Sequence, residues 1–264
     1  MRGPAFVIAL LISSFLVVAA QAAIEDTFII RNSTGSGDPP VIQTNNDYVT
    51  GATEFVISQG GQKAAWGTDA LDGQKVGQIV QLAITRYDDR TRFTAGTGPY
   101  VAPYFNIWIT DGLGNFAVIA NEPSNAAFQS LYSNGYDLDW NDISGKVAKV
   151  YENADTSWLP NSGVGLTFAD VANFTIQAPT VSDLTTGWLG LGSGAPRELG
   201  TNLAYGFNWI FGDTLSNYVA DVDDEGYVVD GFAARGAVPE PLTLLTWGGL
   251  VGCAVMGARR YRQS

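Results

Sequence analysis

The chain is 264 residues long, has a formal net charge of −12, and contains no histidine and a single cysteine. The missing histidine excludes Ser-His-Asp and Cys-His catalytic arrangements and the usual zinc and copper sites. The acidic balance disfavours nucleic acid and anionic lipid as partners of the exported part. The sequence also contains no phosphate loop, dinucleotide fingerprint or internal repeat.

The first 22 residues have the features of a secretory signal peptide. Arg2 supplies a positive charge, and Ala5–Ala20 is apolar apart from two serines. Small residues at Ala20 and Ala22 then suit signal peptidase. We therefore expect residues 1–22 to be removed, with an uncleaved transmembrane anchor as the alternative.

Residues 23–237 are predicted to form one exported domain of β type. Residues 23–238 hold 25 of the 26 acidic and 10 of the 14 basic side chains, a net charge of −15. The only cysteine, Cys253, lies beyond this domain. We therefore expect a hydrophobic core rather than disulfides to stabilise the domain.

Short runs with strand-like alternation follow one another along this domain. The first three predicted strands are Asp26–Arg31, Glu54–Ser58 and Ile79–Arg86. Tyr104–Thr110 and Asn115–Ala120 are predicted to pair as a hairpin around a glycine-containing turn.

The second half of the domain is less regular. Ser124–Ser133 has apolar residues at helical spacing and predicts one short helix, with Gly135 as its C-cap. Further strands are predicted at Lys146–Tyr151, Gly165–Phe168, Asn173–Gln177, Ala204–Phe211 and Tyr227–Phe232. About ten short strands with few helices predict an all-β fold, an antiparallel and jelly-roll-like β-sandwich with one or two short helices.

The Tyr104–Thr110 strand offers a possible glycan contact. Tyr104, Asn106 and Trp108 share one strand face, opposite the apolar face of the same strand. Aromatic rings with an amide between them suit a sugar ring, through stacking and hydrogen bonds to hydroxyl groups. The alternative is that this face is buried under a helix or a second sheet.

Acidic side chains raise two further possibilities. The run Asp221–Gly226 gathers hard oxygen ligands of the kind that calcium prefers, although its spacing does not match an EF-hand. Its weak candidate ligands are Asp221, Asp223, Asp224 and Glu225, and Asp88-Asp89 is a weaker case. Hydrated turn acids are the alternative, and we commit to no metal or other cofactor.

Without histidine, carboxylate-based glycoside hydrolysis is the main enzymatic class left open. The glutamates are scattered, so we expect no enzyme.

The last 27 residues, 238–264, contain three parts in a fixed order. Val238-Pro239-Glu240-Pro241 comes first, and its prolines favour an extended backbone. The apolar run Leu242–Ala258 follows, 17 residues long. As a helix it would measure about 26 Å, a minimal transmembrane span. The tail ends in the basic run Arg259-Arg260-Tyr261-Arg262, which belongs on the cytoplasmic side.

This tripartite tail resembles the PEP-CTERM sorting signal of Gram-negative bacteria. The resemblance covers about a tenth of the chain and rests on the order of the three parts at its C-terminal end. It implies an exosortase-type processing enzyme as partner, membrane-embedded and thought to cleave the tail during export. The implied sorting residues are Pro239, Glu240, Pro241, Arg259 and Arg260.

Together these features predict a non-enzymatic protein of the bacterial cell surface or extracellular matrix. The protein would be anchored in the inner membrane through residues 242–258 before processing. Two alternatives stay open for residues 23–237. One is a carbohydrate-binding module for exopolysaccharide, and the other is a carboxylate-based glycosidase.

Overall fold

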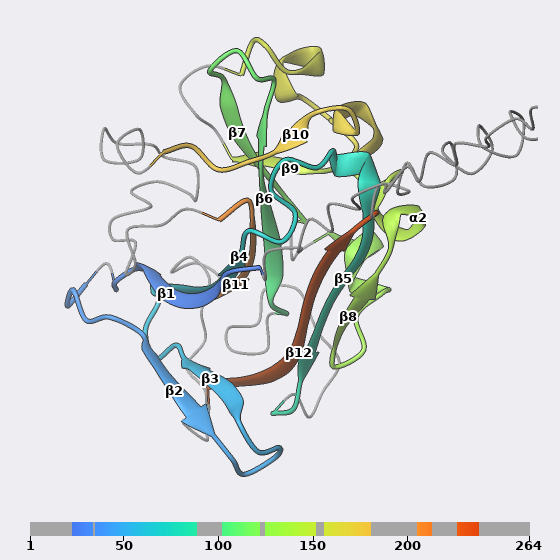
Figure 1. The fold of residues 1–264 in the computed structure, drawn as a ribbon. Coiled ribbons are helices and arrows are strands. Elements are labelled where there is room, and N and C mark those ends of the chain that lie inside the picture. Colours follow the sequence, from blue (N-terminus) through green and yellow to red (C-terminus); the bar gives the residue numbers. More distant parts are fainter. Residues whose placement is uncertain are drawn as a thin grey trace, which may run out of the picture.

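The computed structural model describes residues 23–33, 35–88, 102–121, 125–151, 156–180, 205–212 and 226–237. These residues are mostly β, with two antiparallel sheets and a few short helices (Figure 1). The predicted all-β class is therefore confirmed. No helix among the described residues is long and apolar enough to cross a membrane. The predicted signal peptide and the predicted membrane helix both lie outside the described residues.

The larger sheet, here called sheet A, has seven strands in the order β1-β4-β11-β6-β7-β9, with β10 also pairing with β6. Its strands are β1 (Glu25–Arg31), β4 (Lys63–Thr68), β6 (Tyr104–Thr110), β7 (Phe116–Ala120), β9 (Lys149–Tyr151), β10 (Thr175–Ile176) and β11 (Phe207–Phe211). Sheet B has five strands in the order β2-β3-β12-β5-β8. Its strands are β2 (Val41–Asn45), β3 (Ala52–Val56), β5 (Ile79–Arg86), β8 (Gly135–Leu138) and β12 (Tyr227–Gly236).

Short helices occupy the connections between strands. They are η1 (Val76–Gln78), α1 (Ala126–Gln129), α2 (Trp140–Ile143), η2 (Pro160–Gly163) and η3 (Ala169–Val171). The predicted helix is present as α1 but ends with Ser130 as its C-cap. Gly135, predicted as the cap, instead begins β8, where it pairs with Thr85. Its φ of 136° and its close approach to the Ile84 carbonyl leave no space for a Cβ atom.

The two sheets pack face to face around a shared hydrophobic core. Alternate residues of each strand point into it, such as Phe105 in sheet A and Leu82 in sheet B. Stacked rings join the sheets directly. Phe55 lies 3.9 Å from Phe211 between ring centroids. Offset or stacked aromatic pairs of this kind contribute about 0.5–1.5 kcal/mol beyond their buried area.

A β-bulge in β12 brings a further aromatic residue into this core. The pairing of β12 with β5 shifts register between Asp230 and Ala233. Gly231 takes the left-handed conformation at the bulge, with a φ of 66°. The next residue, Phe232, then stacks on Trp66 of sheet A, with ring centroids 4.7 Å apart.

The last two strands among the described residues, β11 and β12, occupy internal positions in the sheets. β11 lies between β4 and β6 in sheet A, and β12 lies between β3 and β5 in sheet B. Between β3 and β6 the chain passes from one sheet to the other at every step. The centre of each sheet therefore combines strands from the two ends of the domain.

Sheet A is also apolar on the face that points away from sheet B. A second cluster of buried side chains lies there: Phe28, Ile30, Ala65, Tyr104, Trp108, Val118, Tyr205 and Ile210. The core residues of the same strands point the other way. The central strands of sheet A are therefore buried on both faces, which is uncommon for an antiparallel sheet.

Candidate functional site

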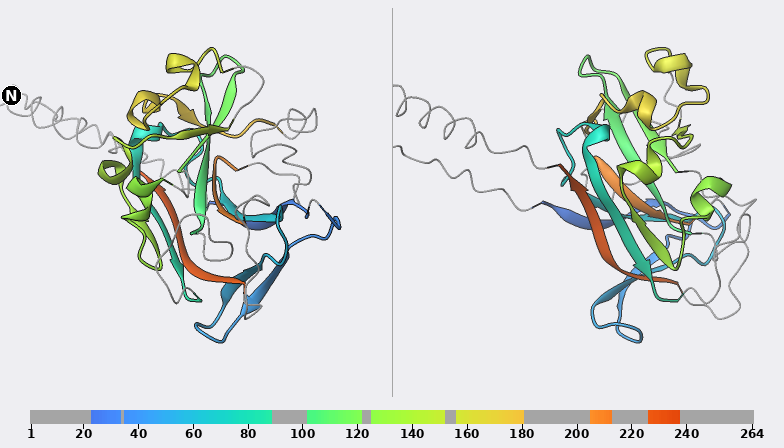
Figure 2. Two further views of the ribbon diagram at one scale, coloured as in Figure 1. Left: turned by 180° about the vertical axis from the view of Figure 1, so that it is seen from behind. Right: turned by 90° about the vertical axis from the view of Figure 1, so that its right-hand side faces the viewer.

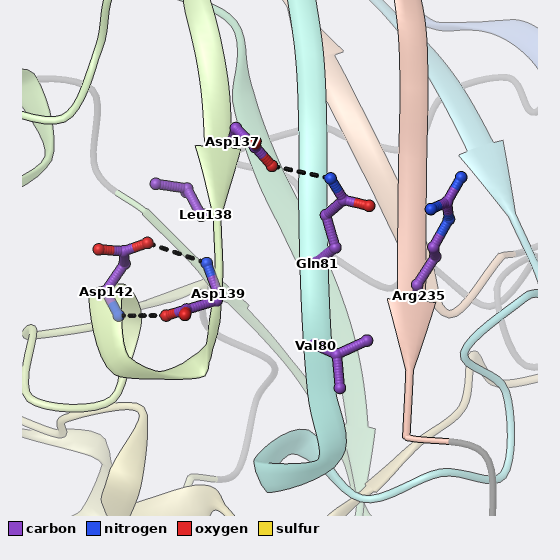
Figure 3. Close-up of a pocket in the computed structure, with 7 residues that line it drawn as sticks. All are labelled: Val80, Gln81, Asp137, Leu138, Asp139, Asp142 and Arg235. Atoms are coloured by element: carbon purple, nitrogen blue, oxygen red, sulfur yellow. Dashed lines mark hydrogen bonds between the residues drawn. The ribbon is translucent and has the colours of Figure 1, made fainter.

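An open groove lined mostly by polar side chains lies on the outer face of sheet B. It has a volume of about 360 Å³ and is lined by Val80, Gln81, Asp137, Leu138, Asp139, Asp142 and Arg235 (Figure 3). These residues come from β5, β8, the start of α2 and β12. The pairing of β8 with β5 and of β5 with β12 brings them together. The sequence predicted none of them as a site, because the members lie far apart along the chain.

The carboxylates of this groove form structural hydrogen bonds. The Gln81 amide donates to Asp137 at 2.8 Å. Asp139 and Asp142 form a capping box at the start of α2, each accepting the other's backbone N–H at 3.0 Å. The Asp142 backbone N–H lowers the pKa of Asp139, so this carboxylate stays ionised at neutral pH. Asp139 is thus a poor general acid, whereas the groove as a whole offers hydrogen-bonding groups to a polar ligand.

The predicted glycan contact is wrong, because its three residues do not lie on the surface. Tyr104, Asn106 and Trp108 do share one face of β6, but they are only 2%, 1% and 3% exposed. Tyr104 and Trp108 belong to the second apolar cluster, on the outer face of sheet A. A sugar ring cannot stack on rings that are already buried.

Two buried amides, Asn106 and Asn208, lie on the same face of sheet A as this cluster, and the sequence prediction included only Asn106. Asn106 and Asn208 pair across β6 and β11. The Asn208 amide donates to the Tyr205 carbonyl at 3.0 Å. Among the described residues, Asn106 finds no hydrogen-bond partner for either side-chain polar atom, and Asn208 finds none for its oxygen. Unpartnered buried amides of this kind are uncommon and costly.

The other predicted site residues lie outside the described part of the chain. These are the sorting residues Pro239, Glu240, Pro241, Arg259 and Arg260, and the calcium candidates Asp221, Asp223, Asp224 and Glu225. Within the described ranges, no group of three or more acidic or cysteine side chains could hold a metal ion. Calcium binding at the acidic run stays a prediction.

Asp88, a weaker calcium candidate, is instead the partner of a buried arginine. Its carboxylate accepts from Arg86 Nη2 at 2.6 Å, and both side chains are 3% exposed. It also accepts the Val228 backbone N–H at 2.8 Å. Burial alone would lower the pKa of Arg86, but the Asp88 carboxylate outweighs it and raises that pKa above its usual range. Asp88 therefore serves the ion pair rather than a cation.

Among the described residues, the Asp72 carboxyl group has a strongly raised pKa. The residue as a whole is exposed, but its carboxyl group accepts the Gly206 N–H at 3.1 Å. Burial of the carboxyl group and the nearby charge of Asp69 raise its pKa to about 7. A raised pKa suits a general acid, but structural carboxylate pairs have the same property.

We predict that Asp72→Asn flattens the pH dependence of stability. The folded pKa of about 7 exceeds the ordinary value of 3.8, so the folded state binds the proton more tightly. Stability should therefore fall as pH rises through this window. Asparagine keeps an oxygen that can accept the Gly206 N–H and removes the charge. Because solvent screens this charge, the gain in stability at alkaline pH should be about 1 kcal/mol or less. Melting temperatures at acidic and alkaline pH test this, with Asp47→Asn, at an exposed turn, as control. Equal slopes in wild type and Asp72→Asn would contradict it.

Comparisons of the chain with protein-family models, with curated proteins and with solved structures find no match in any of the three.

Proposed function

We propose that this chain is an exported, non-enzymatic protein of a Gram-negative cell surface or extracellular matrix, delivered by its C-terminal tail. One observation carries the proposal. The Val-Pro-Glu-Pro segment, the apolar run and the arginine-rich end stand in this order at residues 238–264. An exosortase-type enzyme would process the tail, after anchoring in the inner membrane through residues 242–258. The protein would then remain at the surface or leave the cell.

Three further features support export. The N-terminal 22 residues suit removal by signal peptidase. Residues 23–237 contain no cysteine, so their folding does not depend on disulfide chemistry outside the cytoplasm. Their acidic balance favours solubility and disfavours adhesion to anionic surfaces. Delivery, rather than catalysis, is the activity that these features support together.

We further infer that the body is a jelly-roll sandwich. The inference rests on the strand order, in which β11 lies between β4 and β6, and β12 lies between β3 and β5. A Greek key places a late strand beside an early one, and two such keys make a jelly roll. The eight strands concerned are β3, β4, β5, β6, β7, β8, β11 and β12. Jelly-roll domains include lectins, but the fold alone does not assign a ligand.

Mass spectrometry of the mature C-terminus tests the proposal. In a host that carries an exosortase, the wild-type chain should lose its tail, whereas a chain lacking Pro239–Pro241 should keep it. Leu113→Ala, at a side chain that is 86% exposed in the β6–β7 turn, is the control and should be processed normally. An intact tail on the wild-type chain would contradict the sorting function.

Exopolysaccharide binding is a second candidate, supported by the groove of Figure 3. Carboxylates, the Gln81 amide and the Arg235 guanidinium meet there at an open surface. Such groups can form hydrogen bonds with the hydroxyl groups of a sugar chain. A glycan array of the full chain should then lose signal with Gln81→Ala but not with Leu113→Ala. Equal signals for both variants would remove the groove from consideration.

A further inference from the structure

Both ends of the exported domain are fixed to one short segment, Asp69–Gln78. The Ile24 backbone N–H donates to the Asp69 carboxylate at 2.7 Å, and the Asp69 N–H returns a bond to the Ile24 carbonyl at 3.3 Å. At the other end, the Ala237 N–H donates to the Gln78 carbonyl at 2.7 Å. A residue near the start of the body and its last residue are thus held by the two ends of the same segment.

This segment is itself firmly attached to the body. Its Leu71 and Val76 side chains are completely buried in the shared core. Its backbone bonds to the chain around β10, for instance from Gly73 N–H to the Ile176 carbonyl at 2.8 Å. The N-terminal end of β1 and the C-terminal end of β12 accordingly lie on the same side of the molecule (Figure 2, right). We call this side the termini face, made of Ile24, Asp69, Asp72, Lys75, Gln78 and Ala237.

The tether between this face and the apolar run is short. Only Val238–Pro241 separate Ala237 from Leu242. The five Cα–Cα steps from Ala237 to Leu242 span at most about 18 Å when fully extended. The headgroup region of a bilayer takes up roughly 5–7 Å of that length. A domain of this size has a radius of gyration of roughly 17 Å, so the tether cannot reach around it.

We propose, resting on the membrane-inserted tail of the proposed function, that the termini face is the side of the protein that lies against the membrane surface before processing. The fold sets this orientation, because Gly236 pairs with Ile79 and Ala237 bonds to Gln78, so the chain leaves the body at this face. The Val238–Pro241 segment is then confined to the space between the body and the bilayer. A membrane enzyme that acts on it must approach from the side.

The charges on and beside this face disfavour adhesion to an anionic bilayer. Glu25 and Asp26 begin β1 and pair with Thr68 and Gly67, next to Asp69. With Asp69 and Asp72 they outnumber the nearby basic residues, Lys75 on the termini face and Arg235 two residues before Ala237. Acidic groups are repelled by the negative surface potential of anionic lipids. The tether therefore holds the termini face against the bilayer in spite of a weak electrostatic repulsion. Cleavage of the tether then releases the body from the membrane.

Site-specific quenching tests the orientation in the full chain. A Cys253→Ser chain with one reporter cysteine is labelled with a fluorophore and reconstituted into phosphatidylcholine–phosphatidylglycerol vesicles that carry a headgroup quencher. Gln78→Cys places the reporter on the termini face. Val164→Cys is the control, since this side chain is 73% exposed and follows η2, which is not part of the termini face. Lys75→Cys replaces Gln78→Cys if the latter fails to fold.

Quenching should be several-fold stronger at position 78 than at position 164. A Gly/Ser spacer of about 20 residues after Ala237, with a mean reach of roughly 25 Å, should remove most of that difference. Equal quenching at both positions, in chains that float with the vesicles, overturns the orientation and leaves the sorting proposal intact. Chains that do not float with the vesicles overturn the membrane-inserted tail, and the orientation with it.

Discussion

Replacing Arg86 by methionine should lower the free energy of unfolding by about 3–5 kcal/mol, because the buried Asp88 carboxylate then loses its cation. Arg86 Nε donates to Asp88 Oδ1 at 3.0 Å and Nη2 donates to Asp88 Oδ2 at 2.6 Å, so the pair is bidentate. The guanidinium also lies over the Tyr227 ring at 4.3 Å. The pair thereby joins the end of β5 to the start of β12.

Urea denaturation of a double-mutant cycle measures this effect. Arg86→Met/Asp88→Asn should recover a large part of the loss, since the asparagine oxygen still accepts the Val228 N–H and no buried charge remains. Asp230→Asn, at a half-exposed position of β12, is the control for removing a carboxylate from the same strand region. A loss below about 1 kcal/mol for Arg86→Met would mean that water reaches the pair.

Replacing Phe105 by alanine should cost about 3–5 kcal/mol, the usual range for a buried phenylalanine. Phe105 is completely buried, at the centre of an aromatic cluster in the shared core. Its ring lies 5.7 Å from Phe168 and 5.7 Å from Trp209 between centroids, and 6.2 Å from Phe128. These partners come from β11, α1 and the residue before η3. Deleting the ring therefore removes contacts from several parts of the chain at once.

Phe116→Ala provides a chemically matched control. Phe116 also lies in sheet A, at the start of β7, but it is only partly buried against the second cluster. Its truncation should cost clearly less than that of Phe105, since less apolar area leaves water on folding. Calorimetric melting of both variants decides the order. A larger loss for Phe116→Ala would mean that the second cluster, not the shared core, dominates stability.

The sequence predicted best those strands that are buried on one face or are strongly apolar. Ile79–Arg86 and Tyr104–Thr110 have the predicted bounds in β5 and β6, and Phe207, Trp209 and Phe211 share the core face. β4 was missed because Lys63–Thr68 is buried at every position and contains two alanines and a glycine. β6 is also buried at every position, but its aromatic and β-branched residues favour a strand, whereas alanine and glycine do not.

The prediction at Gly165–Phe168 is wrong as a strand. Thr167 forms only an isolated bridge with Val147, and the residues that follow form η3. The Asp170 carboxylate accepts from both the backbone and the hydroxyl of Thr167 at 2.8 and 2.7 Å. This local bonding competes with the strand ladder. Phe168 still enters the shared core, so its apolar character reflected burial rather than strand structure.

The candidate sites show the same limit of sequence reasoning. Alternation correctly placed Tyr104, Asn106 and Trp108 on one face, but it could not show that this face is covered. The groove was missed because Val80 and Arg235 meet Asp137 only through strand pairing. The Asp139–Asp142 capping box at the start of α2 was not predicted either, although its two residues are only three positions apart.

β11 and β12 come late in the sequence, and their position has a consequence for how the domain folds. Strands β3 to β6 cannot form continuous sheets by themselves, since each sheet lacks its central strand until Phe207–Phe211 and Tyr227–Gly236 are present. Contacts between such distant segments form slowly, because the loop must close before the pairing is gained. If the chain is released N-terminus first, both sheets therefore lack their central strands until almost the whole domain has been released. Folding is completed by the same strand that leads into the tail.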